Sequence, residues 1–209
     1  MLFLLGEKTI ASTENLGEFN CPICDTQKNL LRVIEKNYFT IFFIRILPLG
    51  ITADYNQCDG CGHTYSAIDA EAPLYFETLQ SVLAYLLAGY GLNHGIEVSQ
   101  KIFKAITGKE VSATEIQDRI NHINQGSSLF EQLKTSVNKL SWLDKSLIIE
   151  AAYLLVYAAR PIEYEERLQI NLVGNALGVC LEAVNAIVKN LSAAQYRGIL
   201  AMEIENHTP

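Results

Sequence analysis

The sequence has no excess of positive charge. It contains 16 lysines and arginines against 23 aspartates and glutamates, which gives a formal net charge of −7. The acidity is spread along the chain: residues 1–70 hold 5 basic and 8 acidic side chains, and the rest hold 11 and 15. Proteins that bind nucleic acid through its phosphates need a basic face. The charge therefore argues against nucleic acid as a partner.

Long uninterrupted hydrophobic segments are also missing. Arg45 breaks the apolar run over residues 38–51, and Glu150 breaks the run over 147–159, whereas a membrane-spanning helix needs ~20 predominantly apolar residues. The apolar N-terminus has no basic segment before it and reaches Glu7 before a signal-peptide core of ~7–15 apolar residues is complete. We expect a cytoplasmic protein without a transmembrane segment, for which peripheral contact with a membrane stays open.

Catalytic motifs are not found either. None of the histidines is part of a nucleophile elbow, a phosphate-binding loop or a His/Glu metal helix. They lie in four different segments, at His63, His94, His122 and His207. A fifth cysteine, Cys180, has apolar neighbours, and such a cysteine is usually a small buried hydrophobe. We expect a protein that is not an enzyme and has no catalytic residue.

The sequence does contain two Cys-x-x-Cys units. Cys21 and Cys24 form the first, Cys58 and Cys61 form the second, and 33 residues separate the two units. Each spacing allows one tight turn to direct two thiolates at the same ion, and zinc takes four such ligands in a tetrahedron at ~2.3 Å. We predict one structural zinc ion per chain on these four cysteines. Rubredoxin-like iron and unliganded cysteines are the alternatives.

The residues that follow the two units fit this turn geometry. Gly62 follows the second unit and can adopt a positive φ, which lets backbone amides face the sulfurs. Asp25 occupies the equivalent position after the first unit. His63 lies two residues after Cys61, too near to join a tetrahedron that four thiolates already fill. We expect this histidine at the surface or beside the ligands.

The segment between the two units predicts β-structure. Residues 30–49 are rich in β-branched and aromatic side chains and end at Pro48, Leu49 and Gly50, which favours a hairpin with that turn. The strand around residues 38–47 has no polar face, so cover on both faces is expected. The alternative leaves one side as an interaction surface for a partner protein or a membrane. The candidate residues for that surface are Tyr38, Phe39, Phe42 and Phe43.

The first third of the chain carries a series of motifs in a fixed order. They are Phe3-Leu-Leu-Gly6, Cys21-Pro-Ile-Cys24, Tyr38-Phe-Thr-Ile-Phe-Phe-Ile44, Pro48-Leu-Gly50 and Cys58-Asp-Gly-Cys-Gly62. Over residues 1–66 this order resembles a family of bacterial zinc-ribbon domains. The resemblance implies a metal-binding ribbon, in a family that is defined by its structure more than by an activity. Arg45 stands where the family pattern has proline.

Beyond residue 70 the hydrophobic pattern has a helical period. Apolar residues recur at helical spacing over 81–87, 98–106, 116–123, 146–159, 167–177 and 181–191. These segments predict six or seven helices, the first of which begins between Leu74 and Glu77 after a linker over 67–73. The predicted fold class is α+β. A small β zinc ribbon occupies residues 1–70, and an all-helical domain occupies 71–209.

The helical region contains a weak internal repeat at an offset of 68 residues. Ala84-Tyr-Leu-Leu87 recurs as Ala152-Tyr-Leu-Leu155. The further matching pairs are Ile102 with Ile170, Val111 with Val179 and Ile116 with Val184. We infer two copies of a helical unit that share one core.

The segment from Ala151 to Ile170 joins an apolar helix, Pro161 and an acidic turn. On this pattern, residues 75–195 resemble the TerB family of tellurite-resistance proteins, which implies a bacterial stress-response setting. Where that family has Asp-Gly at a candidate cation site, this chain has Ala159-Arg160, so no metal is expected there. We expect the acidic residues to complement a helix N-terminus. They are Glu163, Glu165 and Glu166.

These features predict a non-enzymatic, zinc-stabilised interaction or scaffold module with a protein partner, and the TerB resemblance implies a bacterial stress-response assembly as its setting. A nucleic-acid-binding zinc-ribbon protein is one alternative. A rubredoxin-like electron-transfer protein is another. The oligomeric state is not predicted by any feature of the sequence.

Overall fold

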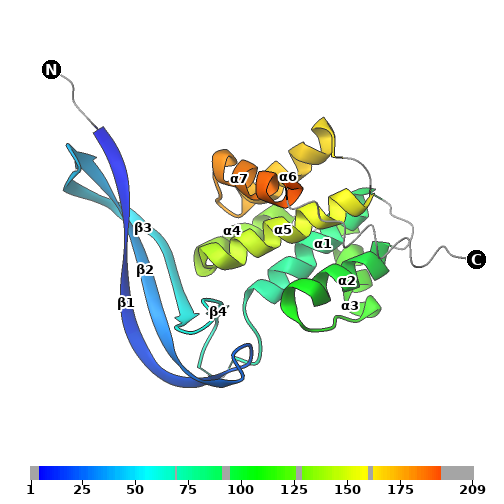
Figure 1. The fold of residues 1–209 in the computed structure, drawn as a ribbon, viewed down its shortest axis with the longest axis horizontal. Coiled ribbons are helices and arrows are strands. Elements are labelled where there is room, and N and C mark those ends of the chain that lie inside the picture. Colours follow the sequence, from blue (N-terminus) through cyan, green and yellow to red (C-terminus); the bar gives the residue numbers. More distant parts are fainter. Residues whose placement is uncertain (1–4, 69, 91–94, 126–128, 160–161, 194–209) are drawn as a thin grey trace, which may run out of the picture. The chain divides into compact units, whose positions relative to one another are not determined.

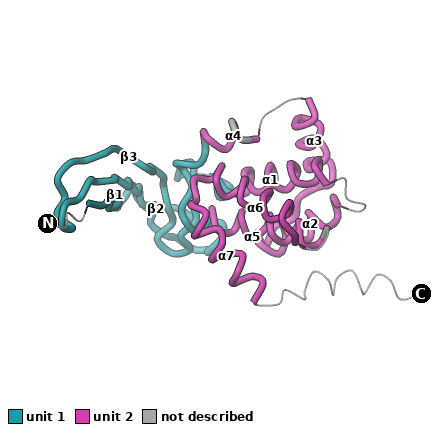
Figure 2. Tube along the Cα trace, turned by 90° about the horizontal axis from the view of Figure 1, so that it is seen from above, with its two compact units in different colours: residues 1–75, 136–144 teal, residues 76–135, 145–209 magenta. Residues whose placement is uncertain are grey.

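The fold consists of an antiparallel sheet followed by helices (Figure 1). A computed structural model describes residues 5–68, 70–90, 95–125, 129–159 and 162–193. Within these residues, four strands precede seven α-helices, which confirms the predicted α+β class. The chain divides into two compact units (Figure 2). Unit 1 comprises residues 1–75 and 136–144, and unit 2 comprises 76–135 and 145–209. The predicted boundary after residue 70 stays a prediction.

Three long strands and one short strand build the sheet of unit 1. They are β1 (Leu5–Cys21), β2 (Thr26–Ile41), β3 (Ile44–Cys58) and β4 (Thr64–Tyr65), in the order β1-β2-β3-β4. The sequence analysis predicted no strand between Gly6 and Cys21, whereas β1 pairs with β2 as far as Cys21. Most side chains of β1 are exposed, so backbone pairing holds the strand without the hydrophobic pattern that would have revealed it.

The turn between β2 and β3 differs from the predicted one. The chain reverses at Phe42 and Phe43, which have φ values of 51° and 66°, and Pro48 and Gly50 lie inside β3. The register between the strands shifts at three places, one of them between Asn37 and Tyr38, opposite Pro48. Around Pro48 and Gly50, β3 pairs with β2 only, and bulges accommodate proline and glycine in such an unpaired edge. The prediction of a Pro-Leu-Gly turn is therefore wrong.

This Phe-Phe turn gives the first testable prediction. A left-handed conformation costs a side-chain-bearing residue roughly 1–2 kcal/mol, and Asn-Gly is the pair that such a two-residue hairpin turn prefers. We expect Phe42→Asn with Phe43→Gly to stabilise the hairpin by about 1–2 kcal/mol, seen as slower amide hydrogen exchange in the flanking strands. Phe42→Ala with Phe43→Ala removes the same rings and keeps the strain, so equal protection in both variants would contradict this account.

The helices begin at the end of unit 1. They are α1 (Tyr75–Tyr90), α2 (Gly95–Thr107), α3 (Ala113–Asn124), α4 (Leu129–Ser136), α5 (Trp142–Ala159), α6 (Tyr164–Ala176) and α7 (Leu181–Ala193), with a 3-10 helix, η1 (Val137–Lys139), after α4. All six predicted helical segments coincide with helices, and α4 is the helix that the pattern missed. Within the described residues, no helix has the length and apolar character needed to span a membrane.

The internal repeat reappears in the helix boundaries. Shifted by 68 residues, α1, α2 and α3 coincide with α5, α6 and α7 to within one residue at each end. Within unit 2, α2 packs on α3 as α6 packs on α7. The matching pairs are buried in both copies: Ile102 and Ile170, Val111 and Val179, Ile116 and Val184. The predicted repeat is therefore confirmed, because the same positions fill the core twice.

Candidate metal centre

The four predicted cysteine ligands come together at one end of the sheet. The sulfur atoms of Cys21, Cys24, Cys58 and Cys61 all lie within 4.8 Å of one another. The Sγ atoms of Cys21 and Cys61 are 3.7 Å apart, and those of Cys24 and Cys58 are 4.0 Å apart. In a tetrahedron with ligands at ~2.3 Å, neighbouring sulfurs are about 3.8 Å apart. The four thiols are therefore spaced as ligands of one ion and lie too far apart for disulfides.

Tight turns place each pair of sulfurs. In the first turn the Asp25 amide donates to the Cys21 carbonyl, and in the second the Gly62 amide donates to the Cys58 carbonyl. Asp25 and Gly62 both adopt a positive φ, of 52° and 76°, as the sequence comparison of the two units predicted. The amide of Gly60 also donates to Cys58 Sγ at 3.3 Å. The second turn thus aims an amide at a ligand sulfur.

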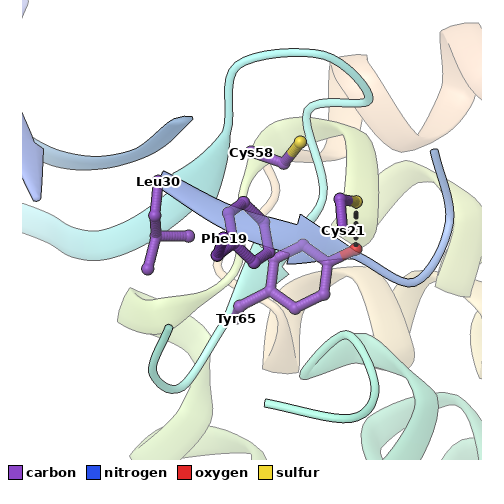
Figure 3. Packing of buried hydrophobic residues seen from close by; sticks show 5 residues of the cluster. All are labelled: Phe19, Cys21, Leu30, Cys58 and Tyr65. Atoms are coloured by element: carbon purple, nitrogen blue, oxygen red, sulfur yellow. Dashed lines mark hydrogen bonds between the residues drawn. The ribbon is translucent and has the colours of Figure 1, made fainter. Parts of the chain in front are cut away.

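A small hydrophobic cluster packs against the sulfurs, with Cys21 and Cys58 buried and Cys24 and Cys61 half-buried. Figure 3 shows Phe19, Leu30 and Tyr65 packed beside Cys21 and Cys58. The rings of Phe19 and Tyr65 meet edge to face, with centroids 5.2 Å apart. With four thiolates and an apolar wall, the centre has the closed form of structural zinc sites, which leave no open coordination position for a substrate.

Tyr65 contributes a polar contact to this wall. Its hydroxyl lies 3.1 Å from Cys21 Sγ. Burial raises the pKa of Cys21, but hydrogen bonds from the Tyr65 hydroxyl and from the amides of Cys24 and Ile23 outweigh this effect and lower the pKa to about 6. Burial also raises the pKa of Tyr65 above its usual value, so the hydroxyl keeps its proton. Tyr65 therefore donates to a sulfur that is held as a thiolate.

The second prediction concerns this hydroxyl. Partners that hydrogen-bond to metal ligands typically contribute 10–100-fold to metal affinity, so Tyr65→Phe should weaken zinc binding by about 10-fold or more while the ring keeps its packing. Competition with a chromophoric chelator measures the affinity. Tyr55→Phe is the matched control, because its hydroxyl donates to Glu35 Oε1 at 2.9 Å and does not contact a sulfur. Equal affinities for the two variants would exclude a role for Tyr65.

His63 lies beside the second turn and is not at the surface. Its side chain is 12% exposed, its Nδ1 is 2.8 Å from Asp144 Oδ1, and its ring stacks on Tyr75. An ionised carboxylate only accepts hydrogen bonds, so Nδ1 is the donor in this pair when Asp144 is ionised. Of the two predicted positions for His63, the structure favours the one beside the ligands.

Asp144 is fully buried and accepts several hydrogen bonds in unit 1. Its Oδ2 accepts from the Thr64 amide at 3.1 Å, the Thr64 hydroxyl at 2.7 Å and the Ser141 hydroxyl at 3.0 Å. The Asp144 amide in turn donates to Ser141 Oγ, as in the cap of a helix N-terminus. The sequence analysis missed this carboxylate. Its sequence signal is weak, because Ser-x-x-Asp is also an ordinary helix start.

The predicted interaction surface lies on a part of the sheet that we call the hairpin arm, residues 36–52. Tyr38 and Phe39 are half-buried, whereas Phe42 and Phe43 are 53% and 80% exposed. Five more large apolar side chains of the arm are exposed: Ile44, Ile46, Leu47, Leu49 and Ile51. The expectation that this strand would be covered on both faces is wrong for the arm, whose apolar side chains are exposed. That this surface binds a partner stays a prediction.

The remaining candidates of the helical region belong to unit 2. Cys180 is exposed, because it is the residue before α7 and only its carbonyl joins the helix, accepting from Ala183 and Val184. The prediction that it is buried is wrong. Glu163 is the N-cap of α6, and Glu165 and Glu166 lie in its first turn, as predicted. Five residues named above lie outside the described part of the chain: Phe3, His94, Arg160, Pro161 and His207.

The comparisons agree with this centre. Four clustered thiols at the end of an antiparallel sheet are the arrangement expected of a zinc ribbon, and a family model described as a zinc-ribbon family matches residues 19–100. The matched span contains all four cysteines and Tyr65. No curated protein and no solved structure matches the chain. The thiolate set and the family match together favour zinc as the metal.

Proposed function

We propose that this protein is a non-enzymatic interaction module in which one structural zinc ion stabilises a ribbon that presents the hairpin arm to a partner. The observation that carries the proposal is the exposed apolar surface of the arm. Soluble proteins rarely expose contiguous apolar patches without a binding role, and seven large apolar side chains of the arm are exposed.

The metal centre supports a structural role for the ion. Four thiolates complete its coordination, so a substrate would have to displace a ligand. The two turns that hold the ion lie where β1 meets β2 and after the end of β3. An ion at this position fixes one end of all three long strands, and the arm lies at the other end. The zinc centre and the interaction surface are therefore the anchored and the free end of the same sheet.

The resemblance of the helical region to TerB proteins supports a bacterial stress-response assembly as the setting, in the cytoplasm. In such an assembly the helical repeat would supply a second docking face. Repeated helical units are a common scaffold for protein contacts. This setting rests on fold-level analogy.

Site-specific photocrosslinking tests the proposed function. A photoreactive phenylalanine derivative replaces Phe43 in one variant and Tyr164 in another, since Tyr164 is equally exposed, at 82%, but lies in α6. In the cells that make the protein, we expect discrete crosslinked products from position 43 and none from position 164. The products should disappear when Cys58→Ser removes the metal centre. The proposal would be contradicted if position 43 gave no crosslinked products, or if positions 43 and 164 gave equal amounts.

A further inference from the structure

We propose that the hairpin arm binds the surface of an anionic lipid bilayer, with the Phe42-Phe43 turn entering the boundary between headgroups and acyl chains. The inference rests on the proposed function, because it assigns a partner to the same arm. Three features of the arm select this partner: exposure on both faces, the conformation of the turn, and the sign of its charges.

Apolar side chains cover both faces of the arm. Leu47 pairs with Phe39 and Ile51 pairs with Lys36. Phe39 and Lys36 are an odd number of positions apart in β2, so the two partners point to opposite faces of the sheet, and Leu47 and Ile51 are 59% and 60% exposed. Ile44 and Phe43 extend the same exposure to the turn. A docked protein covers one face of a sheet, whereas a lipid interface surrounds whatever enters it. Exposure on both faces therefore favours the lipid.

The turn carries side chains that its backbone does not favour. Both Phe42 and Phe43 have positive φ, where asparagine and glycine fold most easily. Strained residues that persist in a structure cluster at sites of function. Two aromatic rings at the most distal point of the hairpin are the side chains that interfacial segments use to enter the acyl boundary.

The charges of the arm complement an anionic surface. Although the whole chain has a net charge of −7, residues 36–53 contain no acidic side chain and include Lys36 and Arg45. Arg45 lies over the Tyr38 ring, 5.9 Å from its centroid, and Lys8 of β1 pairs with Tyr38. The nearest acidic side chain of β1, Glu7, accepts a hydrogen bond from Asn37.

The position of these cations agrees with the depth of interfacial binding. Lys8 is opposite Tyr38, four residues before Phe42, which corresponds to about 13 Å at the rise of a strand. Interfacial segments bury their apolar face ~5–10 Å into the headgroup and acyl boundary. With the turn at that depth, Lys8 and Arg45 lie at the level of lipid phosphates, where each basic residue adds to the attraction.

Vesicle co-sedimentation of the full, zinc-loaded chain tests the inference. The probes are phosphatidylcholine vesicles with and without about 30% phosphatidylglycerol, an anionic content in the range that attracts basic segments. We expect binding to the anionic vesicles that weakens with added salt. Phe42→Asn with Phe43→Gly should lower this binding about tenfold or more, since two buried rings are lost. We expect the turn of this variant to be at least as stable as the turn of the parent, so a loss of binding would not be explained by unfolding.

Further variants separate the contribution of the basic residues from that of the apolar side chains and test the depth that the turn reaches. Lys36→Gln with Arg45→Gln should weaken binding to anionic vesicles and reduce its salt dependence. Tyr164→Asn with Leu181→Asn removes exposed apolar side chains outside the arm and should bind as the parent does. Phe43→Trp in a Trp142→Phe background should show fluorescence quenching by brominated lipids, because the tryptophan would reach the acyl boundary.

Three outcomes would overturn the lipid partner: no binding to the anionic vesicles, unchanged binding by the Asn-Gly variant, or an unquenched tryptophan. If crosslinks from position 43 persist and join two copies of this chain or a protein, the proposed function stands with another partner. If those crosslinks are also missing, both proposals fail.

Discussion

Cys58→Ser should abolish metal binding and unfold the ribbon while the helices of unit 2 remain folded. Structural zinc sites contribute about 10–16 kcal/mol of apparent binding free energy at neutral pH, which is comparable to the whole stability of a domain. Elemental analysis should give about one zinc per chain for the parent and a much lower content for the variant. Circular dichroism should show a helical melting transition in both proteins, and an added chelator should act on the parent as the mutation does.

Cys180→Ser is the matched control for this experiment. It makes the same chemical change at an exposed cysteine outside the metal centre, so its zinc content and melting should equal those of the parent. A Cys58→Ser protein that keeps its metal and its ribbon would contradict the four-thiolate centre. Iron in the purified parent would replace structural zinc by a redox-active centre and revive the electron-transfer alternative.

Asp144→Ala should destabilise unit 1 by about 3–5 kcal/mol, the typical cost of removing one partner from a buried charged network. The substitution leaves the Thr64 amide, the Thr64 hydroxyl and His63 Nδ1 without the carboxylate that they contact, and each unsatisfied buried group costs ~1–3 kcal/mol. Denaturant titration followed by tryptophan fluorescence measures the effect. The chain has one tryptophan, Trp142, which lies two residues from Asp144 in unit 1.

Asp118→Ala is the control that tests whether the destabilisation by Asp144→Ala depends on the burial of the carboxylate. Asp118 is an exposed carboxylate in α3, and surface substitutions of this kind usually change stability by less than about 0.5 kcal/mol. If Asp144→Ala and Asp118→Ala had equally small effects, the network around Thr64 would not contribute to the stability of the ribbon.

The metal centre could be predicted from the sequence because its signals are local. Each Cys-x-x-Cys unit places two ligands within one turn, and Gly62 and Asp25 show where the backbone needs a positive φ. The helical repeat was also visible, since Ile102 and Ile170 fill equivalent core positions. In both cases a fixed spacing along the chain corresponds directly to a position in space.

The features that the sequence did not predict depend on distant or backbone interactions. Asp144 lies 80 residues from Thr64, and no local pattern connects them. The predicted turn position was wrong because Pro48 and Gly50 are strong turn signals, yet bulges accommodate both of them in a part of β3 that pairs with β2 only. The Phe-Phe turn goes against residue preference and could be found only from the backbone angles.

Unit 1 is discontinuous in the chain, and this has a consequence for fragments. A fragment of residues 1–75 would contain every thiolate but would lack residues 136–144, and with them the only described carboxylate that contacts both His63 and Thr64. Such a fragment should bind zinc and still fold less stably than the ribbon within the whole protein. The segment 76–135 is thus an insertion, so the ribbon is complete only after the chain has passed through the first helical copy and returned.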